Sequence, residues 1–259
     1  MQFPRNQIIV FDGLDCSFKE TNFKEYSKFL RLTFYDESYK IFTESFPRYG
    51  NKNCVGVEKW LDGGLDRSHL SKYPYATSSL YAIDRLTYWY ESVHGMERHI
   101  NELDLNGLLK TNSCFIFDRY STSNAIYSTL NGQFVTEKDL LFEKEYFGIP
   151  LPTIVVWMRM RDFEVLDQMI KQKSEKDENE MDTSFIRKVW ERSEDAITSG
   201  VYEKAGIDLL VIECLNDDGS IKSKRQLANE IKTELAKIID RRLENEQQSA
   251  CERKHNFKN

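Results

Sequence analysis

Five short segments with the composition of buried strands occur along the chain. They lie at residues 8–11, 39–45, 114–117, 153–160 and 209–213. Most of them contain a continuous apolar run, such as the one from Ile8 to Phe11. Such runs are typical of parallel strands that are covered on both faces.

Between these segments, apolar residues recur at intervals of three and four positions, which is the spacing of an amphipathic helix. Pro74 favours a first helical turn, and Thr136 is a suitable N-cap. The pattern predicts helices at residues 20–33, 74–102, 121–127, 136–147, 163–171, 185–196 and 227–243, with a shorter one around 57–61. Strands that alternate with helices predict a three-layer α/β sandwich, in which helices cover both faces of a parallel sheet of about five strands.

The sequence contains no internal repeat and no linker between two domains, so residues 1–244 are expected to form one domain. Residues 171–183 are strongly charged and lack an apolar period. They are interpreted either as a mobile lid or as a solvated linker or helix face. The polar segment 245–259 is expected to be a disordered tail.

The first predicted strand runs into a sequence that resembles a phosphate-binding loop. Gly13 and Lys19 have the spacing of the G-x-x-x-x-G-K-[ST] motif. Phe18 replaces the second glycine, Glu20 replaces the hydroxyl residue, and Thr21 offers a hydroxyl one position later. A loop that leads into a helix N-terminus binds anions, because free N–H groups and the helix dipole point at the ligand. We therefore interpret residues 13–21 as an altered P-loop, with an ordinary strand–turn–helix as the alternative.

Charged residues also follow the second and third predicted strands. Arg48 comes shortly after residues 39–45, and Asp118 and Arg119 come directly after residues 114–117. In parallel sheets, ligands bind beyond the carboxyl ends of the strands. The sequence thus places three groups of candidate residues at one edge of the sheet.

Composition limits the class of protein further. The formal net charge of −6 disfavours a general role in nucleic-acid binding. The five cysteines are scattered without a C-x-x-C pair, which argues against a zinc site and a disulfide framework. The N-terminus leaves no room for a signal peptide before the first strand, and no apolar run is long enough to span a bilayer. A cytoplasmic protein that does not bind membranes is expected.

Several motifs, taken in order, resemble those of the thymidylate kinase family of P-loop nucleoside-monophosphate kinases. They are VFDGLDCSFKET, ESFPRYG, YPYATSSLYAIDR, FDRYSTSNAIY, KEYFGIPLPTIVVWM and GSIKSKRQLANEI, within residues 7–240. The combination of YAxDR with a later DRYxTSNxIY is the most specific part of the match. The resemblance implies transfer of the γ-phosphoryl group of ATP to dTMP with Mg²⁺ as cofactor, in nucleotide biosynthesis. It also implies a homodimer.

The resemblance assigns roles to individual residues. Lys19, Asp118 and Arg119 match catalytic positions, with Asp118 orienting Mg²⁺ directly or through water and Arg119 bridging the two substrates' phosphates. Positions implied to bind ATP are Gly13, Cys16, Ser17, Phe18, Lys19, Glu20, Thr21 and, from the lid, Lys173. Positions implied to bind dTMP are Asp15, Arg48, Tyr81, Arg85, Arg119, Tyr120, Ser123, Asn124 and Tyr127.

Within the dTMP site, the resemblance implies that Asp15 contacts the sugar 3′-hydroxyl and that Tyr81 stacks on the base. Arg85 would bind the base edge, and Tyr120 would exclude a ribose 2′-hydroxyl. Arg48 directly follows Pro47, whereas some family members place their phosphate-binding arginine one residue later.

Structural roles remain open for some of these residues. Asp118 and Arg119 could form an ion pair at a strand end, Tyr81 could pack in the core, and Arg85 could pair with a neighbouring acid. Two other functions also remain open. One is a kinase for another deoxynucleoside monophosphate, and the other is a nucleotide-binding protein that lost catalysis through its altered loop.

Overall fold

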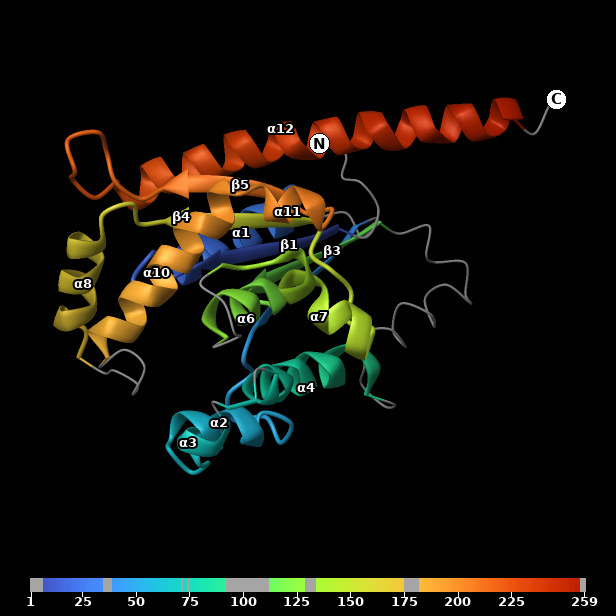
Figure 1. The fold of residues 1–259 in the computed structure, drawn as a ribbon. Helices are drawn as coiled ribbons and strands as arrows, with labels where there is room; N and C mark the ends of the chain where they lie inside the picture. The colour runs from blue at the N-terminus through green and yellow to red at the C-terminus, as the bar shows by residue number, and fades with distance from the viewer. Residues whose placement is uncertain are drawn as a thin grey trace.

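The computed structural model describes residues 7–34, 39–70, 72–73, 75–91, 112–128, 134–174 and 182–256. Its centre is one parallel sheet in the strand order β2-β3-β1-β4-β5 (Figure 1). The strands are β1 (Gln7–Gly13), β2 (Tyr39–Ser45), β3 (Asn112–Asp118), β4 (Ile154–Arg159) and β5 (Asp208–Glu213). The predicted α/β sandwich with a parallel sheet of five strands is confirmed.

Helices cover both faces of this sheet. On one face, α1 (Lys19–Thr33) packs on the first three strands and contacts α12 (Lys224–Asn256), which packs on β5. The other face carries a second layer of helices. That layer consists of α6 (Ser121–Tyr127), α7 (Glu137–Phe147), α10 (Thr183–Thr198) and α11 (Val201–Lys204).

The remaining helices lie beyond the carboxyl edge of the sheet or beside it. Helices α2 (Val55–Leu61) and α4 (Ala76–Tyr90) contact each other, and the short α3 (Arg67–Leu70) lies next to α2 (Figure 1). Helix α8 (Phe163–Gln172) precedes the predicted lid and packs against α10. Residues 175–181 of that lid, which include Lys176, lie outside the described part of the chain.

Two helix ends differ from the prediction. Helix α4 ends at Tyr90 because Glu91 is extended, with φ −60° and ψ 126°; Pro74 and residues 92–111 lie outside the described residues. Helix α12 continues to Asn256, past the predicted end at residue 243 and through most of segment 245–259, for which the sequence predicted a disordered tail. The segment after Leu243 contains neither glycine nor proline and is rich in good helix formers, so nothing in it stops the helix.

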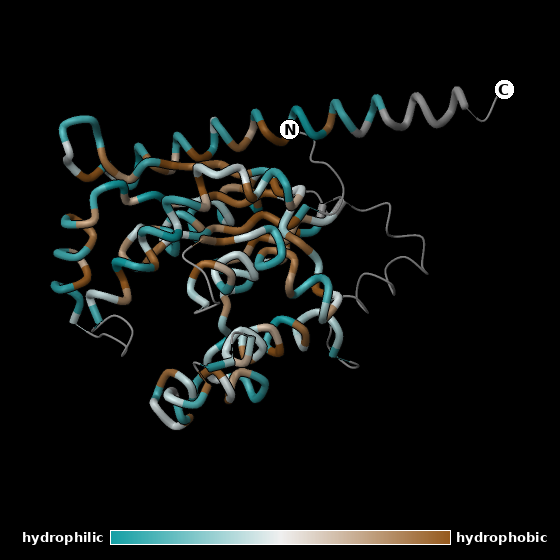
Figure 2. Tube along the Cα trace, in the orientation of Figure 1, coloured by the Kyte–Doolittle hydropathy of each residue, from teal (hydrophilic) through white to brown (hydrophobic). Residues whose placement is uncertain are grey.

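The core lies on both faces of the strands. Every residue of β1 is buried, and Ile9, Val10 and Phe11 have no exposed surface. Figure 2 shows apolar residues concentrated along the strands, while much of α12 is hydrophilic. Among the described helices, none has an apolar stretch that would carry it through a lipid bilayer.

The strand register brings the predicted candidates to one edge. Asp118, at the end of β3, pairs with Phe11 of β1 on one side and with Ser45 of β2 on the other. Gly13 and the loop that follows it therefore lie beside Asp118, as expected for parallel strands whose carboxyl ends meet at one edge.

Candidate active site

The loop between β1 and α1 forms a tight turn. Gly13 has φ +145°, and a Cβ atom there would lie 2.6 Å from Ser17 Oγ and 2.7 Å from the Met158 carbonyl oxygen. Only glycine fits that position. Ser17 closes the turn by donating from its backbone N–H at 3.3 Å and from Oγ at 2.6 Å to the carbonyl oxygen of Leu14.

Phe18 occupies the place of the motif's second glycine in the conformation that glycine favours. Its φ of 63° and ψ of 12° are left-handed, and Cys16 also has a positive φ of 62°. A side chain in this region costs about 1–2 kcal/mol relative to glycine. The Phe18 ring is half-buried and packs against the core, which offsets part of that cost. The loop therefore accommodates phenylalanine at the position of the motif's second glycine.

Lys19 and Arg119 both contact Asp15. Lys19 Nζ donates to Asp15 Oδ1 at 3.1 Å and to the Leu14 carbonyl oxygen at 3.3 Å, and an Arg119 Nη donates to the same Asp15 oxygen. Burial would raise the pKa of Asp15, but the charges of Arg119 and Lys19 outweigh it and hold that pKa below its ordinary value. Two cations from different elements are thus gathered on one carboxylate.

Asp118 differs from Asp15, because one of its carboxylate oxygens has no hydrogen-bond partner among the described residues. Its side chain is mostly buried, and Oδ1 accepts no hydrogen bond from the described residues. Burial raises the pKa of Asp118 above its ordinary value, against the opposing charges of Lys19 and Arg119. A buried carboxylate oxygen of this kind costs free energy until a proton or a cation reaches it.

A cavity of about 510 Å³ opens beside these residues. It brings together most of the residues that the sequence proposed: Asp15, Lys19, Glu20, Tyr81, Arg85, Asp118, Arg119, Tyr120, Ser123, Asn124, Tyr127 and Lys173. Of the predicted residues, Gly13, Cys16, Ser17, Phe18 and Thr21 belong to the loop and the first turn of α1 but do not line it. Trp60 and Leu61 of α2 also line the cavity, and the sequence had given them no role.

The two ends of the cavity differ in character. The loop end holds Lys19, Arg119 and Lys173, and the charge of Lys173 also contributes to the lowered pKa of Asp15. The far end is walled by aromatic and apolar residues of the turn after β2 and of α2 and α4, with one arginine, Arg85, among them. Phosphate suits the first end, and a flat apolar ring suits the second.

Arg85 is held by a partner that the sequence did not reveal. Its Nε donates to Glu143 Oε2 at 2.6 Å and one Nη donates to Glu143 Oε1, and both side chains are 3% exposed. Burial would lower the pKa of Arg85, but Glu143 raises it above the ordinary value. The sequence contained one signal for this role, since Glu143 is a lone carboxylate on the buried face of a helix that also buries Leu140.

Tyr120 forms a fixed part of the cavity wall. It has no exposed surface, its hydroxyl accepts from Trp89 Nε1 at 2.6 Å, and it donates to the Pro150 carbonyl oxygen at 3.0 Å. Ser123, which also lines the cavity, is committed elsewhere because its hydroxyl donates to the buried Asp12.

Arg48 does not line the cavity. Its Nε donates to Asp84 Oδ1 at 2.8 Å, and one Nη donates to the Asp84 carbonyl oxygen at 2.7 Å and to Thr87 Oγ1 at 2.8 Å. The Arg48 backbone N–H donates to Asp84 Oδ2 at 2.8 Å. Arg48 thus ties the turn after β2 to α4. Tyr49, the next residue, lines the cavity instead and is 62% exposed.

Glu20 lines the cavity but is also engaged on the surface of α1. Its carboxylate pairs with Lys24 on the outside of α1, and both side chains are about 65% exposed. At the loop motif's hydroxyl position, the chain thus presents an acid that is turned toward a surface lysine.

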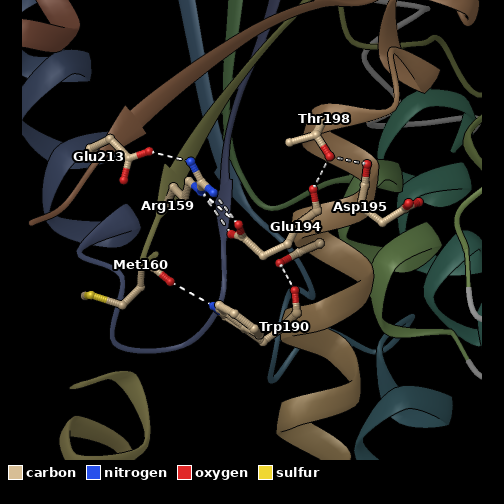
Figure 3. A network of polar contacts seen from close by, with 8 residues as sticks. Arg159, Met160, Trp190, Glu194, Asp195, Thr198 and Glu213 are labelled. Atoms are coloured by element: carbon tan, nitrogen blue, oxygen red, sulfur yellow. Dashed lines mark hydrogen bonds and ion pairs between the residues drawn. The ribbon is translucent and has the colours of Figure 1, made fainter. Parts of the chain in front are cut away.

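Helix α10, which carries Phe185 to the cavity, is anchored at the carboxyl ends of β4 and β5 (Figure 3). Arg159 of β4 donates through Nε at 3.0 Å to Glu194 of α10 and through Nη1 at 2.7 Å to Glu213 of β5. Trp190 Nε1 donates to the Met160 carbonyl oxygen at 2.8 Å. These contacts fix the helix that follows the predicted lid.

Comparison with known proteins identifies the fold. No family model matches the chain, and no curated protein matches it by sequence. Solved structures do match. The thymidylate kinase from Ehrlichia chaffeensis superposes with a TM-score of 0.52 at 17% identity, over 90% of this chain and 100% of that one. A thymidylate kinase from Candida albicans, described as having broad substrate specificity, gives a TM-score of 0.52 at 17% identity over 89% and 92% of the two chains. The fold that the sequence motifs predicted is therefore confirmed as thymidylate kinase-like.

Proposed function

We propose that this protein is a thymidylate kinase that transfers the γ-phosphoryl group of ATP to dTMP, giving dTDP and ADP. The observation that carries the proposal is the cavity, which joins a cationic end at the phosphate loop to an aromatic end with a single arginine. Such a cavity suits a nucleotide lying lengthwise, with its phosphate at Arg119 and its base between Tyr81 and Arg85. The kinase fold of the structural neighbours supports the same conclusion.

The residues at the loop end supply what phosphoryl transfer requires. The reaction brings two anions together in line, so catalysis consists mainly of positioning and of neutralising charge on the phosphate oxygens. Lys19 is held over the loop by Asp15 and the Leu14 carbonyl oxygen, where it reaches the ATP phosphates. Arg119, which donates to Asp15 and lines the same cavity, is the proposed contact to the phosphates of both substrates.

Asp118 fits a magnesium ion. Its unpartnered, buried Oδ1 is a carboxylate oxygen, which is the kind of ligand Mg²⁺ prefers, and Mg²⁺ takes few protein ligands when phosphates and water supply the rest. When bound, magnesium supplies positive charge to the phosphate oxygens. Glu20 is not part of this set, because its carboxylate pairs with Lys24.

The resemblance of the sequence motifs to the thymidylate kinase family also implies a homodimer, which we include in the proposal. Helix α4 exposes Ile83 at 42% and Tyr90 at 38%, seven residues apart and hence on one side of the helix. Light scattering coupled to size-exclusion chromatography tests this, and a monomeric mass at micromolar protein contradicts it.

The function is tested by ADP release from MgATP with dTMP, dUMP, dCMP and dGMP as acceptors. Turnover that is highest with dTMP supports the proposal and shows that the altered loop works. Higher turnover with dUMP or another monophosphate makes the protein a kinase for that nucleotide. Folded protein that binds dTMP without any turnover contradicts catalysis and supports the nucleotide-binding alternative.

A further inference from the structure

Glu143 is a buried carboxylate to which the proposed reaction assigns no part. It lies on α7, is 2% exposed, and does not line the cavity. Two residues that do line the cavity donate hydrogen bonds to Glu143. Arg85 donates to both of its oxygens, and Asn124 Nδ2 donates to Oε1 at 2.8 Å. Arg85 and Asn124 share Oε1, so their side chains are neighbours on one stretch of the cavity wall.

The amide of Asn124 can adopt only one orientation in this arrangement. Its Nδ2 donates to Glu143 Oε1 and, at 2.9 Å, to the Ser78 carbonyl oxygen. Both partners are acceptors, so turning the amide over would place its oxygen against two other oxygens. The NH₂ group is therefore committed to the protein, and the carbonyl oxygen Oδ1 is the polar group that Asn124 offers to a ligand.

Arg85 offers the opposite polarity. Glu143 accepts from the Nε–H and from one N–H of one Nη, so the second Nη keeps both of its N–H groups as donors for a ligand. The positive charge is matched by the Glu143 carboxylate at close range, so this end of the cavity does not attract phosphate as the loop end does. It presents guanidinium N–H donors to a neutral acceptor.

We propose that Glu143 determines base specificity by fixing an acceptor on Asn124 beside a donor on Arg85. The complementary base edge has a ring N–H next to a carbonyl oxygen. The 4-oxopyrimidines, thymine and uracil, have that edge, and 6-oxopurines carry the same pair of groups. Cytosine and adenine present a ring nitrogen acceptor next to an amino donor, so both contacts are mismatched. The inference rests on the proposed function and specifies how that site recognises its base.

The test compares dTMP with 5-methyl-dCMP, which keep the same ring methyl group and differ in the edge under discussion. Dissociation constants are measured by calorimetry without ATP, so the result does not depend on turnover. We expect the wild-type protein to bind dTMP more tightly by about tenfold or more, because each mismatch leaves a buried polar group unpaired. Equal affinity of the wild-type protein for the two nucleotides overturns the proposal.

Glu143→Gln tests the positioning role itself. Glutamine is neutral and carries both a donor and an acceptor, so one of the two acceptors that fix the Asn124 amide is lost and only the Ser78 carbonyl oxygen still opposes a turned amide. The ratio of the two dissociation constants is therefore expected to fall severalfold. A purely structural role would weaken both nucleotides alike and leave that ratio unchanged, which overturns the proposal. Glu145→Gln is the matched control, since Glu145 is exposed on the same helix.

Glu143→Asp provides a second test in case the Glu143→Gln variant fails to fold. It keeps the charge and the acceptor oxygens, so the preference for dTMP is expected to persist even if affinity falls. A loss of preference in Glu143→Asp, with the charge still present, contradicts the proposal. Selective binding of dTMP without ADP release refutes only the kinase activity, so the two proposals fail separately.

Discussion

Replacing Arg48 with methionine distinguishes a phosphate-binding role from a structural one. The sequence placed Arg48 on the acceptor phosphate, but in the structure its side chain pairs with Asp84, whose side chain is 1% exposed. Methionine keeps much of the length and removes the charge. Asp84 is then left as a buried carboxylate that retains the Arg48 backbone N–H but loses the guanidinium.

The expected cost follows from that burial. Removing one partner of a buried ion pair destabilises a protein by about 3–5 kcal/mol, since the other charge remains uncompensated. For a chain of this length, that loss lowers the melting temperature by on the order of 10 °C. The KM for the acceptor nucleotide, measured well below the melting temperature, is expected to change little, because Arg48 does not line the cavity.

Urea unfolding and thermal melts measure the effect, with two further variants for comparison. Arg31→Met removes an exposed arginine that donates one hydrogen bond, to Thr43 Oγ1, and should cost about 0–1 kcal/mol. Adding Asp84→Asn to Arg48→Met removes the stranded charge and should recover part of the stability. If Arg48→Met has wild-type stability and a strongly raised KM for the acceptor nucleotide, the reasoning is refuted. Arg48 would then be assigned to binding the acceptor phosphate.

Three other predictions concern the loop end of the cavity. Phe18→Gly should lower the KM for ATP or raise kcat in steady-state assays, because position 18 is already left-handed and glycine relieves about 1–2 kcal/mol of backbone strain; a loss of activity would show that the loop depends on the ring. Arg119→Ala should reduce kcat by about 10³-fold or more with an unchanged circular dichroism spectrum, and near-normal turnover would contradict its assignment. Asp118→Asn should abolish turnover and stabilise the metal-free protein at neutral pH by about 1 kcal/mol, since it removes a buried oxygen charge without a partner. Because the folded-state pKa of Asp118 is raised, that stability gain is largest above this pKa and disappears as the pH falls through it; denaturant melts that show no gain at neutral pH, or a gain that grows toward acid, would contradict the assignment.

The sequence alone determined the architecture and the edge at which the site forms. Continuous apolar runs and helical spacing are local signals, and a parallel sheet requires the carboxyl ends of its strands to meet. The loop after Gly13, Asp118 and Arg119 therefore had to converge. The motifs around Tyr81 and Asn124 added the residues of the far wall, and these line the same cavity in the structure.

Tertiary structure decided which of these polar groups are available to a ligand. The sequence motifs assign both Arg48 and Arg85 to the nucleotide site. In the structure Arg48 is committed to Asp84 away from the cavity, whereas Arg85 lines the cavity and keeps the N–H groups that Glu143 does not take. Each pairing joins residues that are distant in the chain, by 36 positions for Arg48 with Asp84 and by 58 for Arg85 with Glu143. A hydrogen-bond partner depends on which side chains meet in space and on how much water is excluded, and neither quantity is local to a sequence motif.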